Sequence, residues 1–253
     1  MSSLRDLPRL AMAPFRHSFS ALLRALPETV RGPVAFETKS FVGRLLARRL
    51  QVNPNQRNYM NLGAANDRLE GYVAVDFFSS SGGYGADLRY PLLIDCAVFD
   101  GIFTEHTLEH LSYAEVARVL SECQRILKPG GIIRVIVPDL SIFVDNYASN
   151  SESWFRDWER EVLKPRGRSM ISRMEALSFV TQEYGHRSAW DFETMDGFLT
   201  RAGFTEVRKR AFHEGSDPRL LQDKEDLDRK MVSLYVEAKK AGLPLVGAPA
   251  VDS

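Results

Sequence analysis

The chain has 253 residues, a formal net charge of zero and 44% hydrophobic residues, enough to bury the core of one α/β domain. No apolar run approaches the roughly 20 residues that a membrane span needs, and Arg5, Asp6 and Arg9 interrupt any secretory signal core. Cys96 and Cys123 lie in no metal-ligand spacing, which is typical of a reduced cytoplasmic protein.

The first 57 residues form a basic arm with ten Lys or Arg against three Asp or Glu. Leucines and phenylalanines among the arginines, broken by prolines, predict short amphipathic helices, the best over residues 41–50. Three interpretations stay open: a helical cover packed on the domain, a surface over residues 1–50 that docks peripherally on acidic lipid or a polyanion, and a disordered or targeting segment. We expect no interleaved exposed aromatics in the arm, which disfavours nucleic acid as a partner.

The stretch from Tyr59 to Asp76 predicts two apolar strands joined by a tight turn at Gly63. In an open parallel sheet, ligands bind outside the carboxyl ends of the strands, where a small turn lets the backbone approach. A carboxylate at the end of the second strand, Asp76, can accept hydrogen bonds from both hydroxyls of a ribose. The pair therefore suggests an adenosine-type cofactor.

Polar groups follow the next predicted strands. A glycine and serine loop over residues 77–85 is either a mobile lid or a long connection, and residues 86–89 form a short strand candidate that carries Asp87. The apolar strand at 98–105 runs directly into His106-Thr-Leu-Glu-His110. A polar cluster is therefore expected at the carboxyl end of that strand.

The middle of the chain alternates helix and strand. A capping box from Ser112 to Glu115 begins a helix, Pro129-Gly-Gly131 stops it, and the β-branched run at 132–137 predicts a buried parallel strand that ends before Asp139. This alternation predicts a parallel sheet with right-handed connections.

Residues 141–190 predict a helical insertion at the carboxyl end of that strand, where it could cover a pocket. Its aromatic residues favour core packing over a substrate platform, and residues 164–168 are basic. His186 and Arg187 stand in a polar run without apolar periodicity. The later pattern predicts a helix at 194–202 with Gly203 as its cap, strands at 204–212 and 233–238 joined by a charged connection at 217–231, and a loose tail at 241–253.

Four pieces in chain order resemble the class I S-adenosylmethionine (SAM) dependent methyltransferases. They are Asn61-Leu-Gly-Ala-Ala65, Gly71-Tyr-Val-Ala-Val-Asp76, Phe99-Asp-Gly-Ile-Phe103 with Thr107-Leu-Glu-His-Leu111, and Arg125-Ile-Leu-Lys-Pro-Gly-Gly131. The resemblance is strong over residues 58–140. Segments at 185–187, 199–204 and 233–238 look like a bacterial subgroup associated with glycan pathways.

This resemblance implies an α/β Rossmann-like domain over residues 58–240. Its seven-stranded, mostly parallel sheet would have an antiparallel last strand and helices on both faces. The residues that would border SAM are Asn61, Leu62, Gly63, Ala64 and Ala65 at the methionine part, Asp76 at the ribose, Asp87 and Leu88 at the adenine, and Thr104 and Glu105 at the sulfonium. The family loop commonly has glycine where this chain has Ala65, and the interval from Gly63 to Gly71 is too short for a full helix.

Methyl transfer to a hydroxyl requires positioning and removal of a proton. The candidate bases are His186, His106 and Asp139, and the candidate substrate contacts are Arg187 and His110, each with a structural alternative such as a core hydrogen bond or a solvated face. We expect no metal. The favoured function is O-methylation of a sugar, glycan or related small acceptor.

Two other classes of function remain. The first is a methyltransferase-fold scaffold that binds a partner through the basic arm. The second is a nicotinamide dehydrogenase, which is weaker because Ala64, Ala65 and Asn66 replace the glycine fingerprint.

Overall fold

The computed structural model describes residues 26–65, 67–77 and 83–242. Our expectations for residues 1–25, for the centre of the glycine and serine loop at 78–82 and for the tail beyond residue 242 fall outside the described residues. The chain divides into two compact units, Met1–Ala47 and Arg48–Ser253. None of the described helices is long and apolar enough to cross a membrane.

The described part of the first unit is one helix, α3 (Glu28–Leu45), with Pro33 inside it. The prediction of a helix at 41–50 was wrong in its bounds, because the helix begins earlier and ends at Leu45. The chain is extended at Leu50, whose backbone N–H donates to the carbonyl of Leu93 at 2.9 Å and which forms a parallel bridge with Ile94. This pairing in the second unit requires extended backbone at residue 50.

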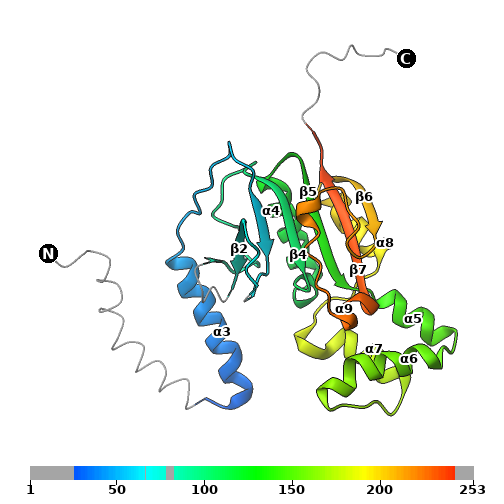
Figure 1. Cartoon of the computed structure of the whole chain (residues 1–253). Helices are drawn as coiled ribbons and strands as arrows, with labels where there is room; N and C mark the ends of the chain where they lie inside the picture. Colours follow the sequence, from blue (N-terminus) through cyan, green and yellow to red (C-terminus); the bar gives the residue numbers. More distant parts are fainter. Residues whose placement is uncertain (1–25, 66, 78–82, 243–253) are drawn as a thin grey trace, which may run out of the picture. The chain divides into compact units, whose positions relative to one another are not determined.

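The second unit is built on a seven-stranded sheet with the order β3-β2-β1-β4-β5-β7-β6 (Figure 1). The first five strands pair in parallel, and β7 is antiparallel to both β5 and β6. The expected Rossmann-like sheet with an antiparallel last strand is confirmed. The strands are β1 (Tyr59–Leu62), β2 (Tyr72–Asp76), β3 (Tyr84–Gly85), β4 (Phe99–Glu105), β5 (Leu127–Pro138), β6 (Phe204–Arg210) and β7 (Ser233–Lys240).

Helices and short turns complete the second unit. The helices are α4 (Tyr113–Ile126), α5 (Leu140–Ala148), α6 (Glu152–Trp158), α7 (Arg173–Gln182), α8 (Phe192–Arg201) and α9 (Leu227–Val232). The short turns are η1 (Leu108–His110), η2 (Glu159–Leu163), η3 (Lys164–Arg166), η4 (Glu183–Gly185) and η5 (Pro218–Leu220).

The segments around β3 and at the start of β5 differ most from the sequence prediction. Strand β3 precedes the expected segment at 86–89, because the carboxylate of Asp87 accepts the backbone N–H of Arg89 at 3.0 Å and folds that segment into a turn. Helix α4 ends at Ile126, before the Pro129-Gly-Gly131 segment, and β5 begins directly at Leu127 and includes that segment.

Caps fix the two helices that cover one face of the sheet. In α4 the expected capping box is present, with the Ser112 N–H donating to Glu115 Oε2 at 2.7 Å. In α8 the Asp191 side chain accepts the Thr194 N–H at 2.8 Å, and Gly203 follows with a φ of 91°. Their apolar sides join the main core, together with β1, β4 and β5.

The insertion after β5 has its own aromatic core. Phe143, Phe155 and Trp158 are each 1% exposed and pack with residues of η2 and α7. Edge-to-face ring pairs, such as Phe143 and Trp158 with centroids 5.6 Å apart, stabilise this core beyond the burial of apolar surface. The prediction that these aromatics form core is confirmed.

The connection between β6 and β7 is held to the sheet by buried charge. Arg134 on β5 is fully buried, and its Nε donates to Asp223 Oδ1 at 2.7 Å. Its Nη1 donates to the Glu214 carbonyl at 2.8 Å and lies 3.5 Å from Glu237 Oε1. This ion cluster fixes the connection on the sheet.

Candidate functional site

Two cavities lie at the carboxyl ends of the strands. The smaller, about 270 Å³, is called here the strand-end cavity. It is lined by Asn61, Gly63, Ala64, Ala65, Asp67, Arg68, Leu69, Phe103, Glu105, His106, Gln222, Lys224 and Arg229. This position, outside β1 and β4, is where open α/β sheets bind ligands.

The turn after β1 is shaped by close contacts with neighbouring strands. Gly63 has a φ of 77°, and a Cβ added there would meet Thr107 Oγ1 at 2.0 Å. The N–H groups of Gly63 and Ala64 donate to the Val75 carbonyl at 2.8 and 3.1 Å. Glycine at residue 63 therefore lets the loop pack closely against Thr107, which lies two residues after the end of β4.

Ala65 and Asp76 meet beside this cavity. Ala65 is a non-glycine residue with a φ of 45°, and its N–H donates to Asp76 Oδ2 at 3.0 Å. Asp76, at the end of β2, lines a small adjoining recess together with Ala64 and Ala65. The structure thus brings Asp76 next to the first loop, as the sequence predicted.

The rim of the strand-end cavity comes from the β6–β7 connection. Arg229 Nη1 lies 3.1 Å from Glu105 Oε2, and Lys224 forms an ion pair with Asp67. These pairs place two cations at the edge of the cavity. The sequence pattern gave no signal for them, because the segment reads only as a charged connection.

The other predicted cofactor residues lie elsewhere. Leu62 is buried in the main core, and Thr104 is 1% exposed with no hydrogen-bond partner for its hydroxyl among the described residues. Asp87 pairs with Arg89 at 2.7 Å, and Leu88 packs on the main core. Neither Asp87 nor Leu88 lines the strand-end cavity, so their roles stay predictions.

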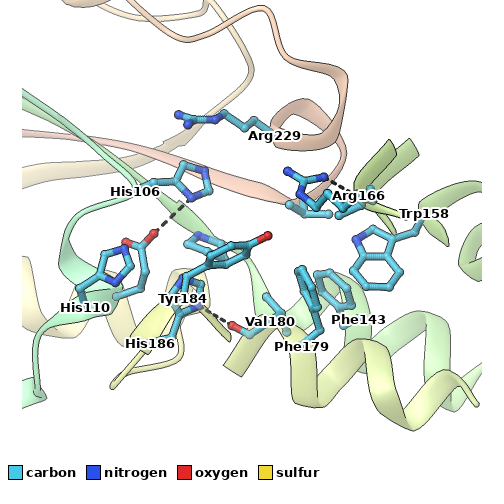
Figure 2. A pocket seen from close by; sticks show the side chains of 14 residues that line it. His106, His110, Phe143, Trp158, Arg166, Phe179, Val180, Tyr184, His186 and Arg229 are labelled. Atoms are coloured by element: carbon cyan, nitrogen blue, oxygen red, sulfur yellow. Dashed lines mark hydrogen bonds and ion pairs between the residues drawn. The ribbon is translucent and has the colours of Figure 1, made fainter. Parts of the chain in front are cut away.

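The larger cavity, about 510 Å³, is called here the histidine cavity. Its lining consists of His106, Glu109, His110, Pro138, Phe143, Trp158, Val162, Arg166, Phe179, Val180, Tyr184, His186, Arg229 and Val232. Figure 2 shows the histidines on one side and the aromatic and aliphatic wall of the insertion on the other. His106 and Arg229 line both cavities.

His106 is held between three elements. Its backbone has a φ of 48°, a strained conformation for a residue with a side chain, and its N–H donates to the Ile136 carbonyl at 2.9 Å. The ring Nδ1 lies 3.2 Å from Glu109 Oε1, and Nε2 lies 3.0 Å from Ser233 Oγ. A carboxylate at Nδ1 favours the tautomer with the proton on that nitrogen.

His110 and His186 are neighbours at the base of the histidine cavity. Their ring centroids are 5.0 Å apart with an edge-to-face arrangement. His186 Nδ1 donates to the Val180 carbonyl at 2.8 Å, and burial lowers the pKa of His110. Among the described residues, Glu109, His110 and His186 form a group whose side chains could share a cation.

Two predicted residues are engaged away from both cavities. Asp139 is fully buried, where Oδ1 accepts the Ser141 N–H at 3.1 Å at the start of α5 and Oδ2 lies 3.2 Å from Lys209 Nζ. Arg187 is half exposed and pairs with Glu115 at 2.8 Å. Neither lines the strand-end or the histidine cavity, and the roles assigned to them stay predictions.

Comparison with known proteins identifies a family match for part of the chain. Residues 84–135 match the family model described as a methyltransferase domain. A search of curated proteins finds no matching sequence.

The solved structures that match this chain include several methyltransferases. A SAM-dependent methyltransferase from Thermotoga maritima, a possible histamine N-methyltransferase, is 16% identical, with a TM-score of 0.44 over 81% of this chain and 89% of that one. A SAM-dependent methyltransferase from Archaeoglobus fulgidus is 15% identical, with a TM-score of 0.41 over 89% and 100% of the two chains. Phosphoethanolamine N-methyltransferase 2 from Haemonchus contortus, in complex with SAM, is 11% identical, with a TM-score of 0.41 over 79% and 51%.

Proposed function

We propose that this chain, a SAM-dependent methyltransferase by its sheet order and by its match over residues 84–135, methylates a hydroxyl of a small, ring-containing acceptor such as a sugar. The acceptor binds in the histidine cavity. One observation carries the proposal: His106 and Arg229 line both this cavity and the strand-end cavity. A donor in one cavity and an acceptor in the other would therefore meet at His106.

The strand-end cavity fits an adenosine-type cofactor. Gly63, Ala64 and Ala65 present a turn without long side chains, and the carboxylate of Asp76 lies next to that turn at the end of β2. When bound, SAM supplies an electrophilic methyl group on its sulfonium. Glu105, at the edge of the cavity, places negative charge where that cationic group would need it.

The chain's own part in the reaction centres on His106. With Nδ1 next to Glu109, the tautomer protonated at Nδ1 leaves the Nε2 lone pair to accept a hydrogen bond from Ser233 Oγ, 3.0 Å away. An acceptor hydroxyl that replaces this serine contact gives its proton to Nε2 as its oxygen attacks. Glu109 orients the ring and stabilises the imidazolium that forms.

The walls of the histidine cavity suit a ring with polar edges. Phe143, Trp158 and Phe179 form an apolar wall that excludes water and packs against the flat face of a ring. Arg229 already pairs with Glu105, and Arg166 adds positive charge to the lining, which suits an acidic or phosphorylated substituent such as that of a nucleotide-linked sugar. A glycan-pathway acceptor is therefore the substrate class that we favour.

Substitution of His106 by asparagine tests this function. Asparagine tolerates a positive φ, so the backbone can be kept while the base is lost. We expect turnover with labelled SAM and a panel of sugars and nucleotide sugars to fall by roughly 100-fold or more, while calorimetry shows unchanged affinity for SAM.

His213 provides a matched control, because it also has a positive φ, of 54°, and lines neither cavity. His213→Asn should leave turnover unchanged. Full turnover in His106→Asn would remove His106 as the base, and failure of every hydroxyl acceptor in the panel would contradict O-methylation.

A further inference from the structure

A buried carboxylate lies among three histidines at the base of the histidine cavity. The chain has five histidines, and three of them, His106, His110 and His186, line this cavity together with Glu109. Figure 2 shows the ion pair between His106 and the carboxylate, with His110 and His186 close by. Ligand atoms of Glu109, His110 and His186 all lie within 4.8 Å of one another.

Glu109 is the unusual member of this group. Its side chain is 1% exposed, and neither carboxylate oxygen has a hydrogen-bond partner among the described residues. The nearest basic atom is His106 Nδ1, 3.2 Å from Oε1. A buried carboxylate that has one imidazole beside it and no hydrogen bond to either oxygen is poorly compensated for its lost hydration, so a cation at this position would stabilise it.

The backbone holds this group together across the chain. The carbonyl of Glu109 accepts the N–H groups of Arg187 and Ser188 at 2.7 and 3.2 Å. These bonds bring the segment that carries His186 onto the η1 turn that carries Glu109 and His110. The cluster is therefore fixed by main-chain contacts that do not depend on its side chains.

We propose that Glu109, His110 and His186 bind a divalent transition-metal ion of the zinc type. Two imidazoles and one carboxylate form a ligand set that leaves coordination positions open. His186 already has the outer contact typical of a ligand, because its Nδ1 donates to the Val180 carbonyl at 2.8 Å and Nε2 remains for the ion.

Geometry permits the site with small side-chain rotations. Ligand atoms around a tetrahedral zinc ion are roughly 3.3 Å apart, given bond lengths of about 2.0–2.1 Å. The present limit of 4.8 Å between ligand atoms closes to that spacing when the rings and the carboxylate turn inward. One Glu109 oxygen can then bind the ion while the other stays next to His106.

This ion would give the histidine cavity a second means of binding an acceptor. Its open positions would take an oxygen of the acceptor, and a Lewis acid lowers the pKa of a hydroxyl that it binds. Proton removal by His106 would then be easier. This role rests on the proposed function, whereas the metal site itself does not.

Cobalt binding tests the site without cofactor or acceptor. We would treat the untagged full chain with chelator, remove the chelator and titrate Co²⁺, following its visible absorption, with Zn²⁺ as competitor. We expect one Co²⁺ per chain at this site with a spectrum of tetrahedral or five-coordinate ligation, displaced by Zn²⁺. Glu109→Gln and His186→Ala should each weaken binding by at least about tenfold.

Two control measurements show whether a loss of Co²⁺ binding comes from the proposed ligands. His213→Asn removes a histidine outside the cluster and should bind Co²⁺ like the parent chain, and metal-free Glu109→Gln should keep the circular dichroism of the parent, because the Glu109 carbonyl still accepts the N–H groups of Arg187 and Ser188. If Glu109→Gln and His186→Ala bind Co²⁺ as tightly as the parent, or the parent binds none, the metal site is overturned. Metal binding without methyl transfer to any hydroxyl would retain the site and contradict only the proposed acceptor.

Discussion

The strand-end cavity and the histidine cavity are built in different ways. The strand-end cavity takes most of its wall from short turns next to β1 and β4, whose residues are close in sequence to the strands. The histidine cavity takes its wall from the insertion at α5 to α7, from η1 and from α9. Most of the strand-end cavity therefore follows from local motifs, whereas the histidine cavity depends on packing between distant segments.

The elements that complete these cavities are also held by different forces. Aromatic packing of Phe143, Phe155 and Trp158 stabilises the insertion. The β6–β7 connection, which supplies the rim of the strand-end cavity, is instead anchored by Arg134 and its carboxylate partners. Substitutions that remove one of these interactions at a time measure how much each contributes to the stability of the chain.

The largest effect is expected for Arg134→Met. It leaves the carboxylate of Asp223 buried without its arginine and Glu237 with Arg210 as its ion-pair partner, which should lower the free energy of unfolding by about 3–5 kcal/mol. Urea denaturation measures this loss. Calorimetry should also show weaker SAM binding, because Lys224 and Arg229 are positioned by the same connection.

An exposed arginine provides the control for this substitution. Arg160 pairs with Asp157 and Glu161 at the surface of the insertion, and exposed pairs contribute little to stability. Arg160→Met should unfold at the same urea concentration as the parent chain. Equal midpoints for the two variants would show that buried charge does not anchor the connection.

A smaller effect is expected for Gly63→Ala in the turn after β1. Gly63 and Gly71 have nearly the same φ, 77° and 79°, yet an added Cβ meets Thr107 at residue 63 and nothing within 4 Å at residue 71. Gly71→Ala should lose only the conformational cost of about 1 kcal/mol. Gly63→Ala should lose about 1–3 kcal/mol more, because the methyl group overpacks the turn.

Urea denaturation of both alanine variants separates the two contributions. A Gly63→Ala chain as stable as Gly71→Ala would mean that Thr107 moves away without cost. The strand-end cavity would then be more adaptable than its close packing indicates.

Local patterns in the sequence were sufficient for the part of the strand-end cavity that lies next to β1 and β2. The alternation of strand and helix, the Ser112 capping box and the carboxylate of Asp76 all depend on residues close in sequence. The parallel strands and the position of Asp76 beside the first loop followed from them, whereas the antiparallel β7 was implied by the family resemblance.

The sequence singled out His106, His110 and His186 in the histidine cavity, but not the contacts that bring them together. Glu109 gave no signal beyond a loop contact, since its importance comes from burial beside His186, which is 77 residues later in the chain. Arg134 interrupts the β-branched run of β5 and was the one visible sign of a buried ion cluster. Its partners could be found only once β7 and the connection were in place.

The smallest effect is expected where the chain departs from the family loop, at Ala65. Ala65 has a φ of 45° and lines the strand-end cavity. Ala65→Gly should relieve that strain and raise the free energy of unfolding by about 0.5 kcal/mol after the entropic cost of glycine. It also removes a methyl group from the wall, so calorimetry should show SAM binding tighter by a few-fold.

Ala97 separates strain from contact, because it has a similar φ of 53° but does not line the strand-end cavity. Ala97→Gly should gain similar stability without any change in SAM affinity. If both variants bind SAM equally, the Ala65 methyl group does not limit the cofactor, and this departure from the family loop affects backbone strain alone. Tighter binding only in Ala65→Gly would assign the cost of the departure to contact with the cofactor.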